Sequence, residues 1–305
     1  MSIVTQPAVA VEARQIGGRI GAEIHGVDLR AEIDDAVFAG INAALLRFKA
    51  LVFRGQHLDD EQQLRFAARF GPLTTAHPTV PSVDGQPNIL PVRGEEGIRA
   101  NRWHTDVTFV QSPPKISTLR AVVIPAYGGN TLIANTAAAY RDLPGPLRAL
   151  ADTVSAVHTN DYDYEQPQFA TEQAADYHKT FVSRRYQTAH PVVRVHPDSG
   201  ERGLFIGGFA QRIVGLSVTE SRDILRLLQA YVTRPENVLR VQWSPGDVVV
   251  FDNRITQHYA PDDYGDQPRT LYRVTVAGDV PTGVDGSPSR IIEGDAAGHY
   301  TPTGS

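Results

Sequence analysis

The sequence contains no cysteine and no long hydrophobic run. With Cys at zero in 305 residues, disulfides, thiol nucleophiles, thiolate metal ligands and iron–sulfur clusters are excluded. No stretch approaches the ~20 apolar residues that a helix needs to cross a bilayer. The first segment, MSIVTQPAVAVEARQ, lacks the basic start and apolar core of a secretory signal. We therefore expect a cytoplasmic protein without membrane association.

Charge of one sign is not concentrated anywhere along the chain. There are 29 Lys and Arg against 34 Asp and Glu, which gives a formal net charge of −5, and no basic block stands out. A protein that binds mainly nucleic acid needs a basic surface to neutralise phosphates, so we expect no nucleic-acid partner. The 41% apolar and 21% charged residues are typical of an ordinary globular protein.

Repeats, low-complexity tracts and Pro/Gly-rich linkers are also absent from the sequence. Their absence predicts one domain over residues 1–305. Residues 160–186 are rich in polar and aromatic side chains without a clean period. This segment is expected to be either a lid or binding loop, or only a solvated connection. We expect a flexible tail from about residue 290.

Hydrophobic periodicity places the expected helices and strands. Helical spacing follows Asp34 and Asp35, and a second helix is expected from Asp59, its N-cap, to Phe70. Two blocks of short strands around a helical insertion predict a mainly β fold with flanking helices. The architecture expected is a double-stranded β-helix, the jelly roll of cupin-like proteins. The other expected helices cover 143–150 and 219–231, and the strands cover 51–53, 116–123, 131–134, 238–243, 248–251 and 270–276.

Three His-x-Asp triplets are candidate metal ligands, because two residues spaced this way on a strand point to the same face. His57-Leu-Asp59 lies at a helix start, where Asp59 is better explained as a cap. His196-Pro-Asp198 is followed by Ser-Gly and is typical of a turn. His104-Thr-Asp106 lies within RWHTDVTFV, a run that suits a strand or its mouth. This third triplet is therefore the candidate pair.

A third ligand is offered by His258, in a late strand region. A single His is more often a hydrogen-bonded core or surface residue, but Arg269 and Arg273 follow it by eleven and fifteen residues. On a strand the two arginines share a face, and two cations on a covered face need anionic partners. Two anionic ligands beside a metal are one solution, and the other is salt bridges to nearby acids: Asp262, Asp263 or Asp266.

This set of ligands and arginines resembles the active site of the taurine dioxygenase family of Fe(II)/2-oxoglutarate-dependent oxygenases. The similarity covers most of residues 15 to 290. The segments NTAAAY and HTNDYDY resemble the bacterial alkyl sulfatase branch, which oxidises sulfate esters, more than taurine dioxygenase itself. Longer matching segments are WHTDVTF (103–109), GGNTLIANTAAAY (128–140), HPVVRVHPDSGER (190–202) and much of 245–279.

The resemblance implies a site for iron and two co-substrates. His104, Asp106 and His258 would bind Fe(II), while Arg269 and the Thr131 hydroxyl would hold the distal carboxylate of 2-oxoglutarate. Two imidazoles and one carboxylate leave three adjacent coordination positions, two for the keto acid and one for O₂. Arginine suits the carboxylate because it can donate two parallel hydrogen bonds.

The resemblance also implies residues for a small anionic organosulfur substrate. Arg273, His77 and the backbone N–H of Val107 would meet its anionic head, and Phe209 would line the pocket near the oxidised carbon. His77 could instead be an ordinary loop residue, and Phe209 could serve core packing alone.

Two features depart from the family pattern. Phe251 stands seven residues before His258, where taurine dioxygenase has a Trp near the metal, so aromatic contacts to the iron site are altered but not lost. Residues 160–186 match the family poorly. The shape of the pocket for the substrate tail therefore stays open.

We expect an oxidoreductase that oxidises the carbon bearing a sulfate or sulfonate. Its products would be an aldehyde and inorganic sulfate or sulfite, with succinate and CO₂, and its expected activity is that of an alkyl sulfatase in a homo-oligomer. Alternatives within the family are a taurine or sulfonate dioxygenase and an aryloxyacetate-type carboxylate dioxygenase. Alternatives outside it are a zinc hydrolase with the same three ligands and a cupin-like binder without catalysis.

Overall fold

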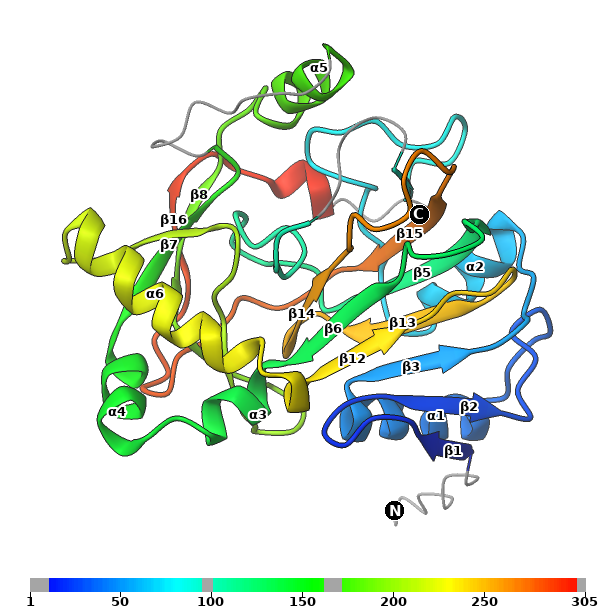
Figure 1. Cartoon of the computed structure of the whole chain (residues 1–305), viewed down its shortest axis with the longest axis horizontal. Helices are drawn as coiled ribbons and strands as arrows, with labels where there is room; N and C mark the ends of the chain where they lie inside the picture. The colour runs from blue at the N-terminus through cyan, green and yellow to red at the C-terminus, as the bar shows by residue number, and fades with distance from the viewer. Residues whose placement is uncertain (1–10, 95–100, 162–171, 301–305) are drawn as a thin grey trace, which may run out of the picture.

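A seven-stranded sheet is the largest layer of the computed structural model, which describes residues 11–94, 101–161 and 172–300 (Figure 1). Neighbouring strands are antiparallel, except for one parallel pair, β2 and β3. In spatial order the strands are β1 (Glu12–Gln15), β2 (Ala22–His25), β3 (Ala50–Phe53), β13 (Val248–Asp252), β5 (Ile116–Val123), β15 (Thr270–Val276) and β4 (Ile89–Arg93).

Smaller antiparallel sheets form the opposite layer. The three-stranded sheet packs against the seven-stranded one through buried side chains such as Ile133 and Val241, which meet Val249 and Phe251. The predicted jelly roll is therefore confirmed. The strands of this layer are β12 (Val238–Val241), β6 (Thr131–Asn135) and β14 (Thr256–Tyr259), then β11 (Ala210–Ile213), β7 (Ser155–Thr159), β8 (Gln187–Pro191) and β16 (Arg290–Glu293), with β9 (Val193–Val195) paired to β10 (Arg202–Leu204).

Helices cover the outer face of the large sheet. α1 (Asp35–Phe48) and α2 (Asp60–Ala68) pack on Val248 and Val250 of β13, whose neighbours Val249 and Phe251 face the interior of the sandwich. Both faces of this strand are covered, which explains why VVVF is apolar without alternation. Asp59 caps α2 as predicted, since its side chain accepts a 2.8 Å hydrogen bond from the Gln62 backbone N–H.

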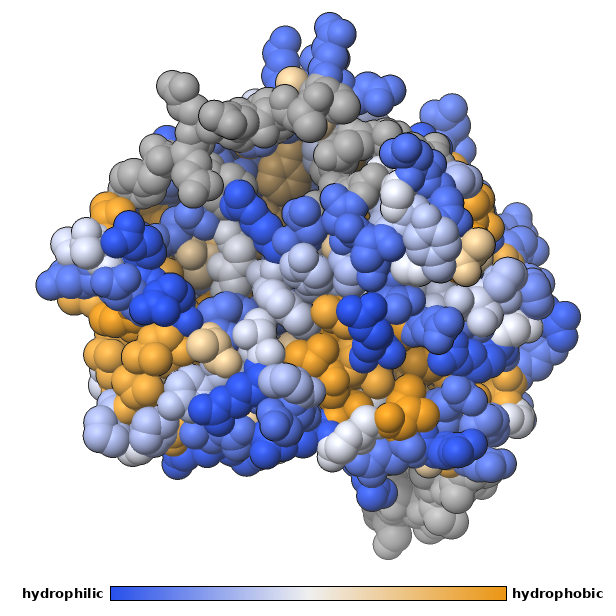
Figure 2. Space-filling view, viewed as in Figure 1, coloured by the Kyte–Doolittle hydropathy of each residue, from blue (hydrophilic) through white to orange (hydrophobic). Residues whose placement is uncertain are grey.

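A second group of helices packs around another core cluster, which includes Tyr140, Leu143 and Leu228. No helix in the described part of the chain is long and apolar enough to span a bilayer. The face of the molecule in Figure 2 is mainly hydrophilic, with apolar side chains gathered near α4 and α6. The helices are α3 (Thr136–Arg141), α4 (Gly145–Thr153), α5 (Glu172–Phe181) and α6 (Val218–Val232), with short 3₁₀ helices η1 (Pro235–Asn237) and η2 (Ala297–Tyr300).

RWHTDVTFV, expected to form a strand or its mouth, is not itself a strand. Only His104 makes a bridge, to His258, and a turn covers 106–109. The backbone groups here are satisfied by distant side chains instead of a ladder. Asn253 exchanges hydrogen bonds with the Asp106 backbone, and the Thr105 hydroxyl donates to the Thr256 carbonyl at 2.7 Å.

The expected lid and tail fall partly outside the described residues, at 162–171 and 301–305. The described part of 160–186 includes α5. Beyond residue 290, β16 pairs with β8, and His299 in η2 is only 3% exposed. A lid at 160–186 and a flexible end therefore stay predictions, while Ala296 and His299 are buried at the end of the described residues.

Candidate active site

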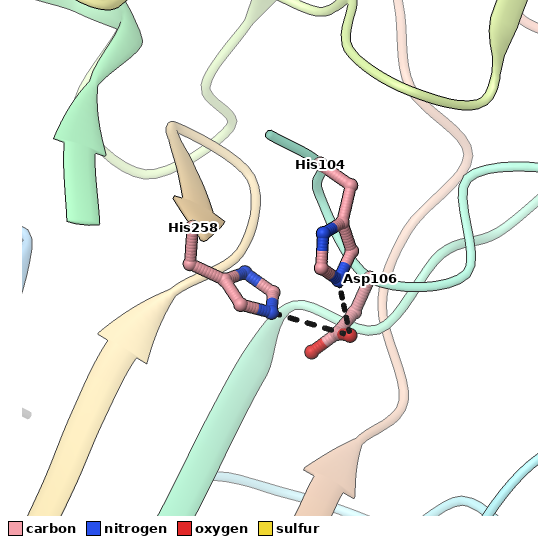
Figure 3. Close-up of side chains that lie close together, drawn as sticks. All are labelled: His104, Asp106 and His258. Atoms are coloured by element: carbon pink, nitrogen blue, oxygen red, sulfur yellow. Dashed lines mark ion pairs between the residues drawn. The ribbon is translucent and has the colours of Figure 1, made fainter. Parts of the chain in front are cut away.

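The side chains of His104, Asp106 and His258 come together, with both histidine rings directed toward the aspartate (Figure 3). The two histidines lie across from each other, because each backbone N–H donates to the other residue's carbonyl, at 3.0 and 2.7 Å. The Nε2 atoms of His104 and His258 lie 3.9 and 3.7 Å from Asp106 Oδ1. One ligand atom from each residue lies within 4.8 Å of the others. The structure thus brings the predicted triad together. His104 lies in an isolated β-bridge and Asp106 in the turn that follows it, rather than on one strand.

The surroundings of Asp106 keep its carboxylate ionised. Its Oδ2 accepts a 2.7 Å hydrogen bond from the Ser117 hydroxyl, and its Oδ1 contacts the Arg273 guanidinium. Burial alone would raise the pKa of Asp106, but Arg273, His258 and His104 together hold it below its usual range. An ionised carboxylate is the form that binds a metal.

His104 and His258 are both neutral, so each has an unprotonated ring nitrogen that can bind a metal. His104 Nδ1 lies 2.8 Å from the Arg102 carbonyl, a contact that requires Nδ1–H and leaves Nε2 unprotonated toward Asp106. Burial lowers the pKa of His104, and it lowers the pKa of His258 to about 3. Two neutral imidazoles and a carboxylate are a donor set that fits Fe(II), and equally Zn(II).

Arg269 is a buried cation without an acidic partner among the described residues. It is 3% exposed, donates to the Gly129 carbonyl at 2.8 Å, and lies 3.4 Å from the Thr131 hydroxyl. No ion pair joins Arg269 to the predicted partners Asp262, Asp263 or Asp266, all within the described residues. Asp263 attracts Arg269 only at longer range, since it accepts from the Gly129 N–H and lies 3.6 Å from Arg240. A desolvated guanidinium needs an anion. The arrangement therefore fits a carboxylate ligand.

Arg273 and His77 lie near the triad from two different elements. Arg273 is in β15 and pairs with Asp106 rather than with any of the three acids that the sequence suggested. Half-buried His77 accepts hydrogen bonds at Nδ1 from the Thr79 and Val80 backbone N–H groups, both at 3.1 Å. The proton must then be on Nε2, which is available to donate. Burial, then Arg273, holds the pKa of His77 well below its usual range.

Val107 has a strained backbone. Its φ is +56°, a conformation that is rare for a β-branched residue and is often found at functional sites. Its N–H donates to no acceptor in the described part of the chain.

Phe209 packs edge-on against His104, with ring centroids 5.8 Å apart. It also contacts Phe109 at 5.1 Å and Phe181 at 6.3 Å. An apolar wall of aromatic rings therefore stands beside the triad, and its Phe181 comes from the last residue of α5.

Comparison with known proteins agrees with this geometry. The model of the "Taurine catabolism dioxygenase TauD, TfdA family" matches residues 12–275. The chain belongs to this family. It is 53% identical to an alpha-ketoglutarate-dependent sulfate ester dioxygenase from Pseudomonas putida over 95% of this chain and 97% of the relative. It is 49% identical to an alkylsulfatase from Acinetobacter baylyi over 93% and 90%.

A solved structure supports the same assignment. A taurine dioxygenase from Burkholderia xenovorans superposes with a TM-score of 0.80 at 40% identity, covering 96% of this chain and 99% of that one. The resemblance drawn from the sequence, including the alkyl sulfatase branch, is therefore confirmed, and so is the fold class.

Sequence reasoning missed several residues of this TauD-like site. Ser117 and Asn253 hold Asp106, and the Trp243 indole N–H donates to the Thr131 hydroxyl at 3.0 Å. Asn253 belongs to a matching segment, Asp252-Asn-Arg254, so its place in the family pattern was a usable signal. Ser117 and Trp243 lie in segments that the sequence predicts only as strands, and nothing in the pattern around them indicates a role in the site.

Two further histidines are buried behind the turn of the triad, and they should make the fold acid-sensitive. His158 and His190 both contact Thr108, and their rings lie 4.9 Å apart. Burial lowers the pKa of His158 to about 3 and that of His190 well below its usual range. Because the unfolded chain binds protons from about pH 6.5 downward while the folded chain does not, stability should fall as the pH drops from 6.5 toward 3.

For His158 alone the expected loss is about 2 kcal/mol between pH 7 and pH 5. Urea unfolding of the metal-free protein at these two values should show a smaller loss in His158→Gln than in wild type. His25→Gln is the control, because the His25 side chain is 38% exposed. Equal losses in wild type and His158→Gln would contradict the assignment.

Proposed function

We propose that this 2-oxoglutarate-dependent dioxygenase oxidises alkyl sulfates at the carbon that bears the sulfate. The observation that carries the proposal is that Arg273, which contacts the triad's Asp106, lies close enough to His77 to lower its pKa, so that a cation and an N–H donor are available for one anionic head. The names of the two curated relatives support the same class of substrate.

His104, Asp106 and His258 would hold Fe(II). When bound, the iron supplies the activation of O₂, coupled to the oxidative decarboxylation of 2-oxoglutarate to succinate and CO₂. The residues of this chain place the ligands and keep their protonation states fixed: Asn253 holds the Asp106 backbone, and the Arg102 carbonyl sets the His104 tautomer.

Arg269 and Thr131 would bind the distal carboxylate of 2-oxoglutarate. Arg269 is oriented by the Gly129 carbonyl, and Thr131 by the Trp243 indole. Both groups are therefore in place before the co-substrate arrives, which lowers the entropy lost on binding.

The sulfate head would lie between Arg273, the His77 Nε2–H and the Val107 N–H, with the alkyl chain against Phe209. Donors from several directions suit a tetrahedral anion better than a planar carboxylate. Hydroxylation of the sulfate-bearing carbon gives an unstable product that collapses to an aldehyde and inorganic sulfate. No general base is required at that carbon, since hydrogen abstraction is the key step.

Medium-chain alkyl sulfates should be turned over better than taurine or a carboxylate of matched length. The apolar wall at Phe209 favours an alkyl chain and gives taurine's ammonium group no polar partner there. His77→Ala should reduce kcat/KM for the alkyl sulfate about tenfold, as expected for loss of one charged hydrogen bond. Succinate release under Fe(II) and O₂ measures each substrate.

The carboxylate of matched length is the control substrate. Residual turnover of the carboxylate should fall less in His77→Ala, because Arg273 alone can serve a planar anion. If wild type preferred taurine or the carboxylate, the sulfatase proposal would be wrong, and the assignments of the metal and 2-oxoglutarate residues would stand.

Two rival functions are less well supported. A zinc hydrolase would use the same triad but would leave the buried Arg269 without an anion. An aryloxyacetate-type oxygenase would need Arg273 but not His77.

We also propose a homo-oligomer in the cytoplasm. Support for association is the exposure of apolar side chains on and near α6, where Val218 is 43% and Leu227 is 40% exposed.

A further inference from the structure

The C-terminal segment packs against the loop that carries His77. The Thr75 backbone N–H donates to the His299 carbonyl at 3.2 Å, and the Thr75 hydroxyl lies 2.8 Å from His299 Nδ1. His299 is 3% exposed, and its neighbour Ala296 belongs to the buried cluster that contains Val107. A residue 222 positions along the chain from His77 is thus bonded to its loop.

The rest of the loop is anchored by other elements. The Thr74 N–H donates to the Thr275 carbonyl of β15 at 3.0 Å, and the Ala76 N–H donates to the Pro87 carbonyl at 2.8 Å. The Thr75 side chain, between these two anchors, is held by His299. The loop is therefore fixed two residues before His77 by the C-terminal segment, and Ala76, between them, also accepts from Arg273 at 3.4 Å.

His299 is also close enough to the head-group residues to affect them electrostatically. Burial, and after it Arg273, lowers the pKa of His299 to about 3. The pKa of His77 is lowered by burial, then by Arg273, then by His299. A neutral His299 therefore stands beside His77 and Arg273 while its Nδ1 is committed to Thr75.

We propose that His299 is a positioning residue that sets where His77 stands relative to Arg273. The His77 Nε2–H can serve the substrate only within about 3 Å of an oxygen, and hydrogen bonds weaken steeply beyond that distance. Without the side-chain hydrogen bond, only the backbone contact between Thr75 and residue 299 remains, so the loop can shift and affinity for the head falls without disturbance of the metal ligands. The identity of the head as sulfate rests on the proposed function.

A double-mutant cycle tests the role. His299→Ala and Thr75→Val should each raise KM for an alkyl sulfate roughly fivefold to tenfold, the loss expected for one buried hydrogen bond. The double variant should be no worse than either single one, because both remove the same contact. His299→Asn should restore most of the affinity, since its amide can replace Nδ1. KM for 2-oxoglutarate and Mn(II) affinity should stay within about twofold of wild type in all variants.

Asp295→Ala is the matched control. It removes a 2.8 Å hydrogen bond to the Ala297 N–H within the same segment, on an exposed residue, and should leave KM unchanged. Additive effects in the double variant, an equal rise in KM for 2-oxoglutarate, or an unchanged KM in His299→Ala would overturn the positioning role.

A second readout separates this inference from the proposed function. The imidazole nitrogen resonances of His77, in ¹⁵N NMR of the metal-free protein, should shift in His299→Ala and return toward wild type in His299→Asn. If wild type oxidises no alkyl sulfate, the proposed function fails, and the NMR comparison still decides the role of His299. An unchanged His77 signal in His299→Ala would overturn it.

Discussion

Asp106→Ala is expected to abolish substrate oxidation, and His104→Ala and His258→Ala are expected to do the same. Each leaves two protein ligands, which make a weak and misarranged Fe(II) site. Loss of an outer partner of a metal ligand already costs roughly 10–100-fold, so loss of the ligand itself should exceed that range. Isothermal titration with Mn(II) measures the site directly, and succinate release measures turnover.

The chain offers a matched control for the aspartate. Asp59 belongs to another His-x-Asp triplet, but its carboxylate caps α2. Asp59→Ala should cost roughly 0.5–2 kcal/mol of stability and leave Mn(II) binding unchanged. The triad assignment would be wrong if a purified variant with His104, Asp106 and His258 all replaced by Ala still showed iron-dependent turnover.

Asp106→Ala has a second expected consequence, because it leaves Arg273 buried without its anion. An unpaired buried cation destabilises the fold, so the metal-free variant should unfold at a lower temperature than metal-free His258→Ala. His258→Ala should lose metal binding but keep its fold. The comparison then separates the role of Asp106 as a metal ligand from its role as the anionic partner of Arg273.

The sequence predicted those parts of the fold that depend on local pattern. The apolar run of β13 and the Asp59 cap both follow from neighbouring residues. The more apolar setting of His104 and Asp106 singled them out among three triplets, and the structure brings them together with His258, although their role as metal ligands stays a prediction.

Features that depend on distant contacts were not predictable. The run around His104 has strand propensity, but Asn253 and Thr256 satisfy its backbone from elsewhere, so a turn forms instead. The sequence left the anionic partner of Arg273 open, and the partner is the metal-ligand candidate Asp106 itself. Nothing near His299 in the sequence indicates its contact with Thr75, which joins segments far apart in the chain.

Arg269→Lys is expected to raise the requirement for 2-oxoglutarate strongly while leaving metal binding nearly unchanged. Arginine can donate two parallel hydrogen bonds to a carboxylate while its Nε–H donates to the Gly129 carbonyl. Lysine keeps the charge but cannot reproduce this arrangement. A charged hydrogen bond is worth about 1.5–3 kcal/mol, which corresponds to a rise in KM for 2-oxoglutarate of roughly 10- to 100-fold. Succinate release across a 2-oxoglutarate titration, at saturating alkyl sulfate, measures it.

Comparison with a different cation separates the co-substrate role from a general effect of charge. Arg240→Lys, in which the side chain is 53% exposed and lies 3.6 Å from Asp263, should leave KM for 2-oxoglutarate unchanged. Thr131→Val removes the other proposed donor and should raise the same KM by a smaller factor, because a neutral hydrogen bond is worth less than a charged one. If Arg269→Lys kept the 2-oxoglutarate dependence of wild type, the buried guanidinium would serve only the fold, and the carboxylate would have to bind elsewhere.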